Sequence, residues 1–129
     1  MKLTTTLGIV LFAHGSRDPL WRAPVDSIAA EVLRQQPGIL VRTAFLEWTT
    51  PDLPGCVREL LEAGATHVRI LPVFLGIGKH LREDLPGLMG SLQQEHPDVQ
   101  FELLASAGES PVVIQAIAAL TLEPGLSQL

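Results

Sequence analysis

Apolar residues along this chain form four short runs, and each run is followed by a stretch with apolar residues at helical spacing. The first run is apolar almost without interruption, which is typical of an interior parallel strand covered on both faces. The predicted strands are 7–13, 40–46, 68–75 and 99–105. Strict alternation of strands and helices predicts parallel pairing through right-handed crossovers. We therefore predict an α/β fold: a three-layer, doubly wound, mainly parallel four-stranded sheet with helices on both faces.

Prolines and capping residues predict where the helices begin. Pro24 fits the first turn of the first helix, and Thr50-Pro51 is the predicted N-cap and first residue of the second. Asp84 is the predicted N-cap of the third helix, and Ser110-Pro111 is the predicted start of the fourth. Pro72 has no N–H to donate, so either it lies beyond the paired part of its strand or the ladder is broken there. The core-facing residues expected in the fourth helix are Val113, Ile114, Ile117 and Leu120.

Length and composition limit the function classes. A chain of 129 residues with 47% hydrophobic residues can form one domain with a core, expected over 1–122, followed by a frayed tail, 123–129. The single cysteine, Cys56, cannot form an internal disulfide, so we expect a cytoplasmic protein. The net charge of −5 argues against a nucleic-acid partner. The apolar runs fall short of the roughly 18 residues that a membrane span needs, so no membrane partner is expected.

Three residues with metal-binding chemistry stand at the ends of the first three predicted strands. His14, Glu47 and His80 follow one another in two steps of 33 residues. Because ligands bind at the carboxyl ends of parallel strands, we expect these side chains at one rim of the sheet. Two imidazoles and a carboxylate suit a borderline divalent ion such as iron, cobalt, nickel, copper or zinc. The same groups could act as general acids or bases without metal, or could be ordinary solvated loop residues.

The remaining histidines and the cysteine are expected to be structural. His67 lies at the start of the third strand, at the opposite end of the sheet from the trio, and His96 stands at a helix C-terminus. Cys56 has no histidine or second cysteine near it in the sequence, so we expect it to pack inside a helix. The pattern Gly76-x-Gly78 lacks a third glycine and does not follow the first strand, which argues against dinucleotide binding.

The motifs around the trio resemble those of the class II tetrapyrrole chelatases, in particular the small single-domain, CbiX-like sirohydrochlorin cobaltochelatases. The resemblance runs from about Gly8 to Leu120. Its motifs are His14-Gly-Ser-Arg-Asp-Pro, Phe45-Leu-Glu, Pro72-Val-Phe-Leu-x-x-Gly-x-His80 and Asp84-Leu-Pro. It implies a chelatase-like sheet with flavodoxin-like topology and a homodimer. It also implies that His14 and His80 bracket the metal ion and that Glu47 lies in the same cleft, all three being catalytic and metal-binding.

The implied reaction is insertion of a divalent metal ion, Co²⁺ above all, into sirohydrochlorin in cobalamin or sirohaem-type biosynthesis. The metal ion would be a substrate, and no organic cofactor is expected. Five residues near the histidine loops are candidates for binding the anionic tetrapyrrole: Ser16, Arg17, Arg22, Lys79 and Arg82. The alternatives are insertion of iron or nickel, a non-catalytic carrier of metal or tetrapyrrole, and an unrelated hydrolase or phosphotransferase that uses His14.

Overall fold

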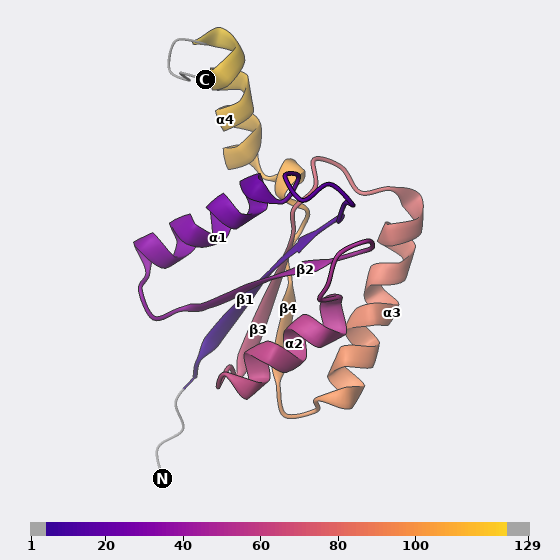
Figure 1. Ribbon diagram of the computed structural model, residues 1–129. Coiled ribbons are helices and arrows are strands. Elements are labelled where there is room, and N and C mark those ends of the chain that lie inside the picture. The colour runs from indigo at the N-terminus through magenta and orange to yellow at the C-terminus, as the bar shows by residue number, and fades with distance from the viewer. Residues whose placement is uncertain (1–4, 124–129) are drawn as a thin grey trace.

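The computed structural model describes residues 5–123, which form a four-stranded sheet and four α-helices (Figure 1). All neighbouring strands pair in parallel, in the order β2-β1-β3-β4. The strands are β1 (Leu7–Ala13), β2 (Leu40–Phe45), β3 (His67–Pro72) and β4 (Gln100–Leu103). The helices are α1 (Ala23–Gln35), α2 (Leu53–Glu62), α3 (Lys79–Glu95) and α4 (Pro111–Leu122), with a short 3₁₀ helix, η1 (Ala107–Glu109), before α4. The predicted α/β fold with a parallel sheet is confirmed.

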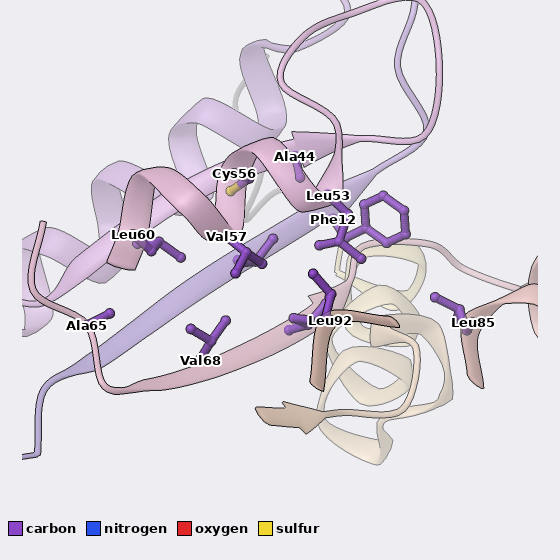
Figure 2. Packing of buried hydrophobic residues seen from close by; sticks show 12 residues of the cluster. Phe12, Ala44, Leu53, Cys56, Val57, Leu60, Ala65, Val68, Leu85 and Leu92 are labelled. Carbon is purple, nitrogen blue, oxygen red and sulfur yellow. The ribbon is translucent and has the colours of Figure 1, made fainter. Parts of the chain in front are cut away.

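Helices cover both faces of the sheet, and the larger core lies on the side of α2 and α3 (Figure 2). There Phe12 of β1 is buried together with Val57 and Leu60 of α2. On the opposite face, Phe45 packs in a smaller cluster with Val25 of α1. The central strand β1 is thus buried on both faces from its middle to its C-terminal end, as its apolar run predicts. The loop that follows β1 therefore starts from a rigid frame.

Two predicted helix starts are wrong. Helix α2 begins at Leu53 and not at Pro51, because the carboxylate of Asp52 accepts a 2.9 Å hydrogen bond from the Gly55 N–H and caps the helix. Helix α3 begins at Lys79, so Asp84 lies inside it and is not its N-cap. The earlier start brings Leu81 against the core, so packing, and not a capping side chain, determines where α3 begins.

Pro72 is the last residue of β3, which ends three residues earlier than predicted. Pro72 is paired with Phe12 of β1, and the next N–H, that of Val73, donates to the Phe12 carbonyl over 2.8 Å. The alternation of a strand directs the Pro72 nitrogen toward β4, whose pairing with β3 ends at Leu103. Neither predicted alternative is therefore right as stated. Pro72 lies within the paired part of β3 on the side of β1, and on the side of β4 there is no pairing at this position for it to interrupt.

Helix α4 begins at Pro111 after Ser110, as predicted, but its predicted core-facing residues do not join the core. No residue of α4 is buried, and Figure 1 shows the helix extending away from the sheet. The predicted tail, 123–129, lies outside the described residues except for Glu123, which ends α4. Within residues 5–123, no helix is long and apolar enough to cross a membrane.

Candidate functional site

The loops after β1 and β2 are joined to each other by backbone hydrogen bonds. The Leu46 N–H donates to the Ala13 carbonyl (2.9 Å), and the Glu47 N–H donates to the His14 carbonyl (3.0 Å). Gly15 makes this approach possible: its φ is +98°, and a Cβ there would stand 1.7 Å from the Glu47 carbonyl oxygen. The parallel pairing of β1 with β2 thus continues past the strand ends, and it sets two functional side chains beside each other.

His14 and Glu47 form a direct pair at this junction. The His14 Nε2 atom lies 2.7 Å from the Glu47 Oε1 atom, and both side chains are about half exposed. A carboxylate that holds one ring nitrogen of a histidine fixes the orientation of the ring and leaves the other nitrogen available for a metal ion or a proton. The edge of Phe74 supports the imidazole, with 6.5 Å between the two ring centroids.

His80 and His14 line the same pocket. The pocket has a volume of about 280 Å³ and is lined by His14, Leu46, Phe74, Gly76, Ile77, Gly78, Lys79, His80 and Leu81. His80 belongs to the first turn of α3, whose N-cap, Gly78, makes no side-chain capping bond. The first N–H groups of a helix attract anions, so this turn adds positive potential next to Lys79.

The structure therefore brings His14 and Glu47 into contact and sets both histidines on one pocket. It does not gather all three side chains into a closed set of ligands. Among residues 5–123, no three histidine, cysteine, aspartate or glutamate side chains lie close enough together to hold a metal ion. The arrangement is a tight His14–Glu47 pair with a second imidazole, that of His80, lining the same pocket as His14, which suits an ion that enters and leaves better than a closed structural site.

The predicted substrate-binding residues differ in their surroundings. Lys79 lines the pocket and is exposed. The Arg17 guanidinium stacks on the Trp48 ring at 3.9 Å, and Arg22 pairs with Asp26 at 3.0 Å. Arg82 donates to the Ile77 carbonyl (3.2 Å) and so closes the turn before α3. The Ser16 hydroxyl accepts the Asp18 N–H (3.0 Å), which gives it a role in shaping the loop. Lys79 is the cation of this set that faces the pocket.

Sequence reasoning missed the apolar wall of the pocket and the indole next to the pair. Phe74, Leu46 and Ile77 line the pocket, although their positions suggested only strand ends and loop. Trp48 directly follows Glu47, has a φ of +70° and is 59% exposed. A bulky residue in the left-handed region is rare, and an exposed tryptophan after a candidate site residue was the signal that could have found it.

The residues expected to be structural do not line the pocket of His14 and His80, and the Nε2 atoms of His67 and His96 are buried without a hydrogen-bond partner among the described residues. His67 lies 3.3 Å from Glu102, which is also bonded to Arg69 at 2.7 Å. The ring of His96, the C-cap residue of α3, is tilted by 46° against that of Phe101, with 6.4 Å between the ring centroids. Cys56 is fully buried in α2, and burial, with a smaller contribution from Glu59, raises the pKa of its thiol to about 12. A thiol with so high a pKa is neutral at physiological pH and unsuited to metal binding or nucleophilic attack.

Comparison with known proteins gives matches over nearly the whole chain. The model of the CbiX family matches residues 8–123. The sirohydrochlorin cobaltochelatase of Methanosarcina acetivorans is 32% identical over 87 residues, which are 67% of each chain. The structure of a CbiX protein from Marinobacter aquaeolei superimposes with a TM-score of 0.78 at 28% identity, over 93% of this chain and 98% of that one. SirB of Bacillus subtilis subspecies spizizenii, in complex with cobalt, gives a TM-score of 0.70 at 21% identity, over 92% of this chain and 51% of SirB.

Proposed function

The chain belongs to the CbiX family, and we propose that it is a chelatase that inserts a divalent metal ion into sirohydrochlorin. The observation that carries this proposal is the His14–Glu47 pair, 2.7 Å apart, whose histidine lines one pocket together with His80. Cobalt is the favoured ion because relatives that this chain matches at 32% identity are sirohydrochlorin cobaltochelatases. Iron or nickel insertion by the same mechanism is the alternative.

Metal insertion requires two events at one face of a planar macrocycle. The M²⁺ ion must pass from protein ligands to four pyrrole nitrogens, and two pyrrole N–H protons must leave. The metal ion is therefore a substrate, and the protein has to hold it by bonds that exchange readily. Neutral imidazole nitrogen meets this need, and a carboxylate can accept a proton at neutral pH.

The His14–Glu47 pair supplies both groups. If Glu47 accepts the Nε2–H of His14, the Nδ1 lone pair of His14 is free to bind the ion. Under this proposal, Glu47 takes one of the two pyrrole protons as the ion moves to the macrocycle, and the other proton leaves to the solvent at the open side of the pocket. His80, at the start of α3, would be the second histidine ligand of the ion.

The tetrapyrrole carboxylates need positive potential at the rim. We propose that Lys79 and the free N–H groups at the start of α3 bind one of them, since both border the pocket. Arg17 is exposed next to Trp48, whose indole offers a flat apolar surface to the macrocycle. Ser16, Arg22 and Arg82 remain predicted substrate-binding residues, and within the chain their side chains are bonded to the Asp18 N–H, to Asp26 and to the Ile77 carbonyl.

The setting of the reaction follows from the same proposal. We propose that the enzyme works in the cytoplasm as a homodimer, in cobalamin or sirohaem-type tetrapyrrole biosynthesis. The pocket, at about 280 Å³, is small for a whole macrocycle, so one chain can enclose only part of this substrate. A second copy, or an open cleft, must account for the rest.

An insertion assay tests the proposal. The purified chain is mixed with sirohydrochlorin and Co²⁺, Fe²⁺ or Ni²⁺ in parallel, and the change in absorbance is followed. We expect His14→Ala and His80→Ala to abolish catalysis, while the matched control His96→Gln, far from the pocket, keeps it. Activity that survives both alanine substitutions would refute the assignment. Binding of metal or tetrapyrrole without insertion above the spontaneous rate would favour the carrier alternative instead.

A second measurement assigns Glu47. The Glu47→Gln variant keeps the shape of the side chain but cannot accept a proton at neutral pH. We expect it to bind metal as the wild type does and to lose turnover. If the variant instead loses metal affinity, Glu47 is a ligand and not the base.

A further inference from the structure

Phe74 stands directly beside His14, one of the two histidines of the candidate site. The two rings are close to perpendicular, at 78°, with 6.5 Å between their centroids. The Phe74 ring also meets the ring of Phe12, which is buried in β1, at 89° and 6.3 Å. Aromatic pairs favour such perpendicular arrangements, so Phe12 restricts the orientation of the Phe74 ring, and the Phe74 ring restricts that of the imidazole.

Phe74 borders two cavities. It lines the pocket of His14 and His80, and it also lines an apolar pocket of about 280 Å³. The second pocket is formed in part by Ile28 of α1 and Val113 of α4. A side chain that borders two cavities has room to turn, because close packing does not hold it on every side. Contacts of the Phe74 backbone are therefore needed to keep the ring beside His14.

A turn that follows β4 holds the Phe74 backbone. The Ser106 hydroxyl donates to the Phe74 carbonyl (2.7 Å), and the Gly108 N–H donates to the same oxygen (2.8 Å). Ser106 is 2% exposed, and among residues 5–123 it is the only buried residue whose side chain contains an oxygen or nitrogen atom. A buried hydroxyl costs free energy unless it is hydrogen-bonded, and the Phe74 carbonyl is the partner that satisfies it.

The turn is itself closed by hydrogen bonds and lies very close to the segment after β3. The Glu109 carboxylate accepts the Ser106 N–H (3.2 Å), and the Glu109 N–H donates to the Ser106 carbonyl (2.9 Å). A Cβ at Gly108 would stand 1.9 Å from the Leu75 carbonyl oxygen. The two segments are therefore in such close contact that a displacement of the turn moves the backbone of Phe74 and Leu75 as well.

These contacts form a row along one edge of the sheet, in which each of the four strands is followed by one member. The strands lie in the order β2-β1-β3-β4, and the members of the row, in the same order, are Glu47, His14, Phe74 and Ser106. Figure 1 shows the η1 turn after β4 at the same end of the sheet as the loop after β1. The imidazole of His14 is thus held from two sides, by Glu47 after β2 and by Phe74 after β3.

We propose that Ser106 is a positioning residue for His14 and acts through Phe74. This inference rests on the proposed function, in which His14 binds the ion. Glu47 holds one nitrogen of the imidazole, and a single hydrogen bond leaves the ring free to tilt about it. The Phe74 ring, kept in place by the bond from Ser106, removes this freedom and directs the other nitrogen toward the pocket. Residues outside the ligand set that orient a ligand raise the affinity for the metal ion without touching it.

The NMR signals of the imidazole rings test the inference without metal or tetrapyrrole, at one fixed pH. An aromatic ring shifts the signals of nuclei close to it, so Phe74→Leu gives the His14 signals without this effect. We expect Ser106→Ala to move the His14 signals toward the Phe74→Leu values, while the signals of His67 and His96 stay where they are. His14 signals of folded Ser106→Ala at the wild-type position would overturn the proposal.

The matched control is Thr121→Val. The Thr121 hydroxyl donates to the Ala118 carbonyl over the same 2.7 Å, but within α4. Its removal should leave the His14 signals unchanged, and an equal shift in Thr121→Val and Ser106→Ala would contradict a specific role of Ser106. Ser106→Cys keeps a weak donor, so its signals should lie between those of the wild type and Ser106→Ala. It is measured in place of Ser106→Ala if circular dichroism shows that alanine prevents folding.

Titration with Co²⁺ alone measures the consequence for the ion. We expect Phe74→Leu to bind Co²⁺ on the order of tenfold more weakly than the wild type. Ser106→Ala should bind it about fivefold more weakly, and Thr121→Val should bind it like the wild type. A chain that shows these effects but inserts no metal ion contradicts only the proposed function. A wild type that inserts the ion, while Ser106→Ala keeps the wild-type signals and affinity, contradicts only the positioning role.

Discussion

Gly15 provides a stringent test of how the site is built, because Gly38 has nearly the same backbone conformation in open space. The φ angles are +98° and +93°. A Cβ at Gly15 would stand 1.7 Å from the Glu47 carbonyl oxygen, whereas nothing lies within 4 Å of one at Gly38. Alanine at either position therefore meets the same backbone penalty, and only at Gly15 does it also push the two loops apart.

The expected destabilisations follow from this difference. The left-handed conformation costs an alanine about 1–2 kcal/mol, which is the whole effect expected for Gly38→Ala. Separation of the loops at Gly15 also breaks the bonds from the Leu46 and Glu47 N–H groups, at about 1 kcal/mol each. Gly15→Ala should then lower the free energy of unfolding by about 3–4 kcal/mol.

Urea unfolding followed by circular dichroism measures the free energy of unfolding of both variants. The insertion assay is run on each variant without urea, where it is folded. Gly15→Ala should also lose insertion activity, because the Glu47 backbone and with it the 2.7 Å contact to His14 are displaced. Gly38→Ala should keep full activity. Equal destabilisation of the two variants, or full activity of Gly15→Ala, would refute the view that close approach at Gly15 holds the His14–Glu47 pair.

Three further outcomes follow from the charges of the described residues. Hydrogen bonding to Arg69 lowers the pKa of Glu102, so the ionised carboxylate stabilises the fold fully above the unfolded pKa, 4.5, and this stabilisation is lost as the pH falls through the lower folded pKa. Glu102→Gln should therefore flatten the acid side of a plot of unfolding free energy against pH, and an unchanged plot would contradict this. Burial raises the pKa of Cys56 to about 12, so iodoacetamide at pH 8 should label it only in urea, and rapid labelling of the folded chain would contradict the structure. Lys79→Ala should raise the KM for the tetrapyrrole about fivefold, which is equivalent to the loss of about 1 kcal/mol from one exposed charge. The KM for the metal ion should stay unchanged and is the internal control. An equal rise in both KM values would contradict a role of Lys79 in binding the tetrapyrrole.

The sheet was predictable because its signal is repeated along the chain. The apolar run 7–13 is the observed span of β1, and the charged and polar residues within 40–46 fit the edge position of β2. His14 and Glu47 were predictable for the same reason, since residues that follow adjacent parallel strands meet at one edge. The 33 residues between His14 and Glu47 correspond to one strand–helix unit, and the structure shows these two residues in contact.

The errors occurred where a boundary depends on packing and not on a local signal. Gly78 gives no side-chain cap, so the sequence favours Asp84 as the N-cap of α3, although the observed N-cap, Gly78, lies six residues earlier. The consequence for the site is direct, because His80 lies in a helical turn and not in a flexible loop. The apolar spacing of α4 shows that the helix needs a partner, but periodicity contains no information about which surface supplies it.

The different supports of the two histidines bear on how an ion could be transferred. His14 is fixed through Glu47 and two backbone bonds to the frame of β1 and β2. His80 depends instead on the first turn of α3, a helix whose start has no side-chain cap. Helix ends fray more easily than strands paired on both sides. Under the proposed function, the ion is therefore retained by the rigid His14 side while His80 withdraws, and the face that His80 leaves is the one through which a planar macrocycle can take up the ion.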